Sequence, residues 1–202
     1  MDGRQTRAWR ISPAGTLAAV VGPSGAGKDS LISLAMAHFS DRPDVHFVKR
    51  IITRDTDAGS EDHTGVSAEE FEIMRLEGSF AVHWDAHGLR YGIPASVNEK
   101  LALGHLVIAN GSRSALHLFS RAFQKLLVIN VTARPEVLAK RLELRGRESS
   151  EDIQRRLERS SLEVTGDFNT VTIDNSDLLA DAGARMIALL EGALCESTAQ
   201  PQ

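Results

Sequence analysis

Residues 22–30 read GPSGAGKDS, between an apolar run at 16–21 and an amphipathic segment that starts at Lys28. Glycines at three of these positions allow backbone conformations that other residues avoid, so successive amide groups can point inward around a phosphate. The N-terminus of the following helix favours negative charge, and a lysine at this position reaches the β- and γ-phosphates. The pattern predicts a P-loop that binds ATP through Gly22, Pro23, Ser24, Gly25, Ala26, Gly27, Lys28, Asp29 and Ser30.

One position departs from the P-loop pattern, because Asp29 stands where a serine or threonine hydroxyl would bind Mg²⁺. A carboxylate is also a hard oxygen ligand for Mg²⁺, and only a metal would make its charge tolerable beside a polyphosphate. Two interpretations remain open. Asp29 binds Mg²⁺ directly or through water with help from Ser30, or it caps the helix and contacts no metal. We expect the first, with Asp29 and Ser30 as metal ligands.

Outside this loop, short apolar runs alternate with amphipathic segments. Apolar strands that alternate with helices favour a parallel sheet covered on both faces. The strands are expected at 16–21, 46–52, 105–109, 125–131 and 170–174, and the helices at 28–39, 112–122, 134–145 and 177–192. The sequence therefore predicts an α/β, three-layer P-loop kinase fold with a parallel sheet of about five strands.

Residues 53–100 interrupt the alternation and predict a small lobe inserted into the sheet domain. Ser67 and Glu70 form a capping box at the start of a helix, and residues 80–92 are typical of a hairpin. The remaining boundaries are expected at 145–156 for a short lid, at 16–192 for the kinase domain, and at 1–15 and 193–202 for flexible tails.

The composition excludes several classes of protein. The chain has 202 residues, a net charge of −4 and a single cysteine, Cys195. One cysteine cannot form a disulfide framework, and no apolar run approaches the ~18 residues of a membrane span. The acidic balance argues against a broad nucleic-acid surface, and residues 1–15 lack the apolar core of a secretory signal. We expect a cytoplasmic protein that binds small molecules, neither nucleic acid nor membrane; its oligomeric state stays open.

The motifs along residues 16–192 resemble the guanylate kinase family of nucleoside monophosphate kinases. GPSGAGK matches the loop of that family, and IITR at 51–54 resembles the start of its acceptor-binding lobe. SAEEF, GSF, HW and RYG follow in the same order, then RLELRG and IQRRL resemble its arginine-bearing lid, and DNSD resembles the segment near the adenine. The resemblance implies catalytic roles for Lys28, Arg141, Arg145 and Arg156, and an ATP contact for Asn175.

The positions that grip the acceptor phosphate in that family are only partly kept. The resemblance assigns Arg54 and Tyr91 to two of them, and His63 stands at the position of a second tyrosine. Asp57 replaces a second arginine, so the phosphate site differs from that of a guanylate kinase.

The guanine-reading positions also differ. The family uses a glutamate before the tryptophan and a serine or threonine after Tyr-Gly, and those positions hold His83 and Ile93. Guanine presents N–H donors, and a site without matching acceptors discriminates against it by orders of magnitude. We therefore expect a pocket without a carboxylate for guanine, and a phosphorylated acceptor whose further phosphate oxygens contact basic groups. The candidates are His63, His83, His87, Arg90 and Arg113.

Four segments resemble one branch of that family, the ribose 1,5-bisphosphate phosphokinases of bacterial phosphonate degradation. They are GKDS at 27–30, EDH at 61–63, HWDAHGLRYGIP at 83–94 and ANGSR at 109–113. The resemblance implies transfer of a phosphoryl group from ATP to ribose 1,5-bisphosphate, with Mg²⁺, giving 5-phosphoribosyl 1-diphosphate.

The same resemblance implies how the acceptor is held. Arg54 and Tyr91 would bind it, and His83 and Arg90 would contact its second phosphate. Three alternatives remain: a guanylate kinase, a non-catalytic binding module related to guanylate kinases, and another small-metabolite P-loop kinase.

Overall fold

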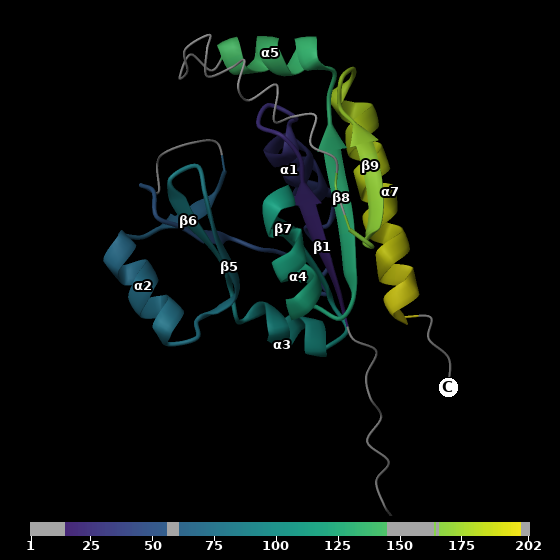
Figure 1. Ribbon diagram of the computed structural model, residues 1–202. Coiled ribbons are helices and arrows are strands. Elements are labelled where there is room, and N and C mark those ends of the chain that lie inside the picture. The colour runs from purple at the N-terminus through teal and green to yellow at the C-terminus, as the bar shows by residue number, and fades with distance from the viewer. Residues whose placement is uncertain (1–14, 56–60, 145–163, 165, 199–202) are drawn as a thin grey trace, which may run out of the picture.

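The computed structural model of the protein describes residues 15–55, 61–144, 164 and 166–198. The strands form a five-stranded sheet and a four-stranded sheet. Figure 1 shows the larger sheet beside the long helix α7 (Leu179–Thr198), whereas the smaller sheet lies on the other side of the molecule with α2 (Ala68–Leu76).

The five-stranded sheet is parallel, and its order is β2-β7-β1-β8-β9. The central strand β1 (Thr16–Val21) is almost completely buried. Its Ala19 lies in register with Ala109 of one neighbour and Val128 of the other. The remaining strands are β2 (Val45–Phe47), β7 (Leu106–Asn110), β8 (Leu126–Thr132) and β9 (Asn169–Asp174). Burial on both faces explains the nearly continuous apolar runs of β1, β7 and β8, and the predicted α/β fold is confirmed.

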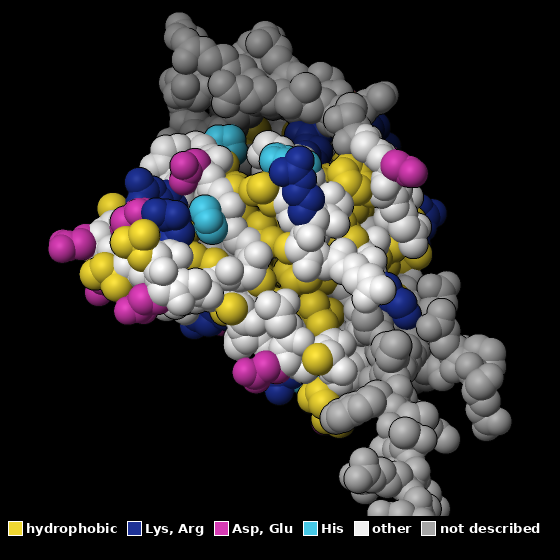
Figure 2. Space-filling view, turned by 60° about the horizontal axis from the view of Figure 1, so that its bottom comes forward, with side chains coloured by type: hydrophobic (Ala, Val, Ile, Leu, Met, Phe, Trp, Pro, Cys, Tyr) yellow, Lys and Arg dark blue, Asp and Glu magenta, His cyan; other side chains and the backbone are white. Residues whose placement is uncertain are grey.

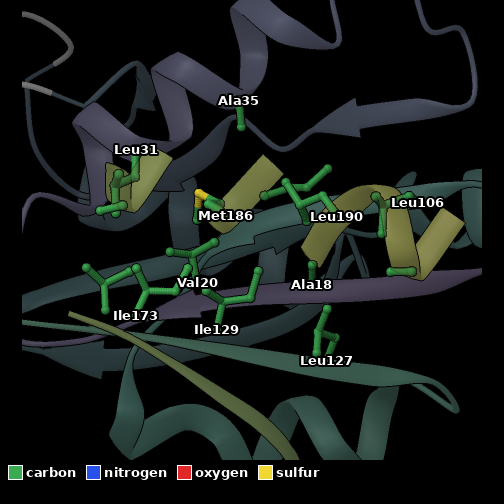
Figure 3. Packing of buried hydrophobic residues seen from close by; sticks show 14 of the residues in the cluster. Ala18, Val20, Leu31, Ala35, Leu106, Leu127, Ile129, Ile173, Met186 and Leu190 are labelled. Atoms are coloured by element: carbon green, nitrogen blue, oxygen red, sulfur yellow. The ribbon is translucent and has the colours of Figure 1, made fainter. Parts of the chain in front are cut away.

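One face of this sheet is covered by α1 (Lys28–His38) and α7, which contact each other. Successive residues of a strand point to opposite faces, and Ala18 and Val20 of β1 point into this layer. They pack against Leu31 of α1 and Met186 of α7, both fully buried (Figure 3). This core fixes the start of α1, and with it the P-loop that precedes the helix.

The opposite face carries a second core. Leu17, Ala19 and Val21 of β1 point into it and pack with Phe119 of α4 (Leu116–Ala122). The short helices α3 (Val97–Ala102) and η1 (Arg113–Ala115) lie on this side, and α5 (Pro135–Leu144) crosses the carboxyl end of β8 (Figure 1). Val82, Trp84 and Ile93 of the small sheet belong to the same core, so this core joins the two sheets.

The small sheet has the order β4-β3-β6-β5. Its strands are β3 (Arg50–Ile52), β4 (His63–Gly65), β5 (Phe80–Ala86) and β6 (Leu89–Pro94). β5 and β6 form the predicted hairpin, with His87 and Gly88 at its turn at φ values of 54° and 73°. The predicted capping box is also confirmed, since Ser67 and Glu70 each accept a hydrogen bond from the other's backbone N–H at the start of α2.

Two expectations about boundaries differ from the structure, and two others are not tested by it. The run at 46–52 is two strands, because β2 pairs with β7 while β3 pairs with β4 and β6, so the chain crosses between sheets at Val48 and Lys49. The last helix extends beyond residue 192 to Thr198, where a tail was expected. The predicted lid at 145–156 and residues 1–14 of the N-terminal tail lie outside the described residues.

Within the described part of the chain, no helix is both long enough and apolar enough to cross a membrane.

Candidate active site

A cavity of about 470 Å³ lies between the P-loop and the small sheet. One wall consists of the loop that follows β1 and the start of α1, and the opposite wall comes from β3, β5 and β6. The residues after β7 close a third side. The cavity is lined by Gly22, Pro23, Ser24, Gly25, Gly27, Lys28, Asp29, Arg50, Glu61, Trp84, Asp85, Ala86, His87, Tyr91, Asn110, Gly111, Ser112, Arg113 and Ser114.

The P-loop adopts the backbone that its glycines permit. Gly22, Gly25 and Gly27 have φ values of 143°, 86° and 89°, in the region that residues with a Cβ rarely enter. Lys28 folds back over the loop, and its Nζ donates to the carbonyl oxygens of Gly22 at 3.0 Å and Pro23 at 3.1 Å. Burial lowers the pKa of Lys28 to about 8, so an anion in the cavity would restore the ammonium's ordinary affinity for its proton.

Two side chains from other elements support the loop from behind. Asn175, which follows β9 and is buried, donates from Nδ2 to the carbonyl oxygen of Ala26 at 2.7 Å. Arg141 of α5 donates to the carbonyl oxygens of Gly25 at 3.3 Å and Asn175 at 2.9 Å. Neither side chain lines the cavity. In this structure both act on the loop backbone, and their predicted contacts with ATP stay predictions.

Asp29 lies beside the strand end of β7. Its Oδ1 accepts a hydrogen bond from Nδ2 of Asn110 at 3.0 Å, and both residues line the cavity. The helix cap is Gly27 rather than Asp29, so the alternative of a capping aspartate is not realised. Two predicted ATP contacts of the loop do not line the cavity. Ser30 is exposed, and Ala26 is fully buried.

The acceptor wall is built on two stacked rings. Trp84 of β5 and Tyr91 of β6 are register partners, and their ring centroids lie 5.4 Å apart with an angle of 10° between the planes. The guanidinium of Arg50 covers them, with Cζ 4.9 Å from the centroid of Tyr91 and 5.8 Å from that of Trp84. Glu61 accepts from Nε of Arg50 at 2.6 Å and also from its Nη2.

Sequence reasoning gave no role to Arg50 or Glu61, although Glu61 belongs to the EDH segment at 61–63 that resembles the family. A signal was present, because Arg50 is a charged residue in an otherwise apolar run, and a buried charge requires a partner. The partner lies eleven residues away, beyond the connection at 56–60, so spacing alone did not reveal it.

The sequence predicted a pocket without a carboxylate for guanine, but the cavity does contain carboxylates. Glu61 and Asp85 both line the cavity. Glu61 is bound on both oxygens by Arg50, whereas Asp85 is largely exposed, with one oxygen 3.9 Å from Nε of Arg90. His83 and Ile93, at the guanine-reading positions, lie outside the cavity lining.

Four predicted acceptor contacts do not line this cavity. His83 is exposed on β5, and Arg90 points to α2, where it donates to Glu72 at 3.3 Å. Their neighbours Trp84 and Tyr91 occupy the cavity side, so the alternation of the strands turns His83 and Arg90 away. Figure 2 shows acidic and basic side chains mixed around α2, at the left of the view.

The other two predicted acceptor contacts that do not line the cavity are His63 and Arg54. His63 is fully buried, with its ring nitrogens 2.9 Å and 3.1 Å from the carbonyl oxygens of Glu61 and Asp55, so it fixes the backbone of the lobe. Nη2 of Arg54 lies 3.4 Å from Nδ1 of this histidine.

The structure brings together the P-loop, Asp29, Tyr91 and Arg113 as expected. Burial lowers the pKa of Arg113, which indicates that this guanidinium has lost part of its hydration. The two remaining candidates, Arg145 and Arg156, lie outside the described residues.

No model of a known protein family matches the chain. Its curated relatives are much more informative. The chain is 58% identical over 182 residues to the ribose 1,5-bisphosphate phosphokinase PhnN of Rhizobium etli, a match that covers 90% of this chain and 92% of that protein. It is also 58% identical over 172 residues to the protein of the same name from Agrobacterium fabrum, covering 85% and 94%. The chain belongs to the ribose 1,5-bisphosphate phosphokinase family. The resemblance seen in the sequence is thereby confirmed.

Solved structures of other kinases share the fold of this chain. A guanylate kinase from Anaplasma phagocytophilum aligns with a TM-score of 0.63 at 18% identity, over 90% of this chain and 87% of that one. A gluconokinase from Sinorhizobium meliloti aligns with a TM-score of 0.54 at 19% identity, over 96% and 100%. At these identities the likeness shows that this ribose 1,5-bisphosphate phosphokinase family shares the P-loop kinase fold.

Proposed function

We propose that the protein transfers the terminal phosphoryl group of ATP to the C1 phosphate of ribose 1,5-bisphosphate, giving ADP and 5-phosphoribosyl 1-diphosphate. An oxygen of the C1 phosphate forms the new bond to the γ-phosphorus, and the bond from that phosphorus to the β,γ-bridging oxygen breaks. Family membership supports the reaction. The observation that carries it is one cavity that joins a P-loop lysine to two guanidinium groups, that of Arg50 on the acceptor wall and that of Arg113 on the side formed after β7.

The nucleotide side of the cavity is the P-loop. Gly22, Ser24, Gly25 and Gly27 line the cavity beside the ammonium of Lys28, and the backbone amides of such a loop, like an ammonium, suit the β- and γ-phosphates. Lys28 then exchanges the carbonyl oxygens of Gly22 and Pro23 for phosphate oxygens. Asn175 and Arg141 keep the loop in its binding conformation through their bonds to its carbonyl groups.

The acceptor side needs positioning rather than a strong base, because the attacking phosphate oxygen is already anionic. Tyr91 lines this side of the cavity, and Arg113 provides N–H donors for phosphate oxygens. Arg54 stays a prediction for holding the acceptor. Arg141, Arg145 and Arg156 stay predictions for a lid that closes over the transferring phosphoryl group.

A divalent metal is implied by the P-loop kinase family, and Asp29 with Asn110 fits one. Oδ1 of Asn110 is buried without a hydrogen-bond partner among the described residues, beside the Asp29 carboxylate. These are hard oxygen donors, and Mg²⁺ bound through substrate phosphates uses only one or two carboxylates. We assign Mg²⁺ to Asp29 and Asn110, and Ser30 is left out because it is exposed. Bound there, Mg²⁺ would neutralise phosphate charge.

The guanylate kinase alternative is less supported, because the chain is 58% identical to curated ribose 1,5-bisphosphate phosphokinases and because His83 and Ile93 replace the residues that read guanine in guanylate kinases. Product analysis tests the proposal. Incubation with ATP, Mg²⁺ and ribose 1,5-bisphosphate should give ³¹P resonances of ADP and of a diphosphate ester in equal amounts. ADP together with inorganic phosphate alone would mean hydrolysis, and no ADP from any acceptor would favour the non-catalytic binding module.

A further inference from the structure

Arg50 is held more tightly than a surface arginine. Its side chain is only 9% exposed, Glu61 accepts from two of its nitrogens, and Tyr91 and Trp84 lie against its guanidinium face. An arginine fixed by a fork-to-fork carboxylate contact and by ring stacking has lost most of its rotamer freedom. The orientation of its remaining N–H groups is therefore fixed.

Stability alone does not account for this pair. Taking two charges out of water costs free energy that their attraction barely repays, and apolar residues of similar size would serve a core at least as well. Both Arg50 and Glu61 also line the cavity instead of being sealed beneath it. Glu61 binds Nε and Nη2, which leaves Nη1 as the third nitrogen of the guanidinium.

The charges around the cavity point to an anionic partner for Arg50. Lys28 and Arg113 line the same cavity, and both have pKa values lowered mainly by burial, so the two cations are short of hydration. The Arg50–Glu61 pair adds no net charge to them. Its contribution is N–H donors on a rigid support, which suits the oxygens of a phosphate.

We propose that Arg50 is a specificity-determining residue that binds a phosphate group of the acceptor, and that Glu61 is the positioning residue that orients it. This inference rests on the proposed function and names the residue that recognises its substrate. None of the motifs in the sequence marked either residue for that role.

The test is isothermal titration of ribose 1,5-bisphosphate into the full chain loaded with ADP, together with KM values for both substrates. The variants are Arg50→Gln and Arg50→Gln/Glu61→Gln, since the double variant leaves no unpaired charge and keeps the fold testable. The matched control is Arg75→Gln. Arg75 makes the same two-pronged contact with Glu72, at 3.0 Å and 2.6 Å, on the exposed surface of α2.

Loss of a charged hydrogen bond should raise the Kd and KM for the acceptor roughly 10- to 100-fold in both Arg50 variants. The Kd for ADP and the KM for ATP should stay within about twofold, as should every constant of Arg75→Gln. Glu61→Gln alone should raise the acceptor KM less, and Glu61→Asp should recover part of that loss. A purely structural role predicts no selective effect on the acceptor.

Two results would overturn the inference, and they differ from each other. If the wild-type protein turns over ribose 1,5-bisphosphate and the folded double variant binds it within about twofold of wild type, only the role of Arg50 is refuted. If the wild-type protein neither binds nor phosphorylates ribose 1,5-bisphosphate, the proposed function fails and the inference fails with it.

Discussion

Replacing Lys28 with methionine should make the unliganded protein more stable at neutral pH while it removes activity. Burial lowers the pKa of Lys28 from 10.5 to about 8. The unfolded chain therefore binds this proton more tightly than the folded protein, and stability rises as the pH increases from about 8 to about 10.5. At pH 7 the lowered pKa corresponds to about 3 kcal/mol of folding free energy. The variant also loses two hydrogen bonds to carbonyl groups, worth ~1 kcal/mol each.

Urea unfolding of the wild type and the variant at pH 7 and pH 10 isolates the contribution of Lys28 to stability, because the two proteins have all other titrating groups in common. The free energy of unfolding of the variant minus that of the wild type should be about +1 kcal/mol at pH 7 and should fall by about 2 kcal/mol at pH 10. ADP release should drop below roughly a hundredth of the wild-type rate, since Lys28 is the P-loop ammonium. A difference in stability that does not change with pH would refute the claim that Lys28 is a desolvated charge.

Three further substitutions test other parts of the site and fold. Asp29→Asn keeps an acceptor for the Asn110 amide but loses the carboxylate charge, so half-maximal activity should require roughly tenfold more Mg²⁺; an unchanged Mg²⁺ titration would exclude the metal role. Asn175→Ala removes the bond to Ala26, so the KM for ATP should rise severalfold and the protein should lose about 1 to 3 kcal/mol of stability, measured by kinetics and denaturation. Ser67→Ala should cost about 1 kcal/mol in denaturation with kcat unchanged, because it removes only the cap of α2.

Much of the fold could be predicted because each buried strand carries its own local signal. β1, β7 and β8 are apolar runs, since a parallel sheet covered on both faces leaves almost no polar position. The capping box of α2 was equally local. The break between β2 and β3 has no local signal, because both strands are rich in apolar residues. The two strands differ only in their pairing partners, which belong to different sheets.

The site also has a part with a local sequence signal, the P-loop, and a part without one, the acceptor wall. The P-loop is contiguous, so its residues and their chemistry could be read directly from GPSGAGKDS. The acceptor wall is assembled from separate strands, and the face on which a side chain lies depends on pleating and register. A one-residue shift turns a side chain to the other face, which is why Tyr91 lies in the cavity while its neighbour Arg90 binds Glu72.

His63 and Arg50 illustrate a second reason why the acceptor wall could not be predicted, namely that their roles depend on tertiary contacts. His63 stands at a position where the family has a phosphate-gripping tyrosine, yet both of its ring nitrogens lie against backbone carbonyl oxygens. Arg50 had no motif to mark it, and its importance comes from a long-range pairing with Glu61 and from two aromatic rings on other strands. Such contacts follow from tertiary structure, and no local spacing encodes them.

The most direct measurement compares two acceptors under identical conditions. Initial rates of ADP release, with ATP and Mg²⁺ saturating, would be recorded for ribose 1,5-bisphosphate and for GMP. A pocket that offers the guanidinium groups of Arg50 and Arg113, and in which His83 replaces the glutamate that reads guanine, should phosphorylate GMP at less than about a hundredth of the rate for the sugar bisphosphate. Comparable rates for the two acceptors would contradict the assignment of this cavity to a sugar bisphosphate.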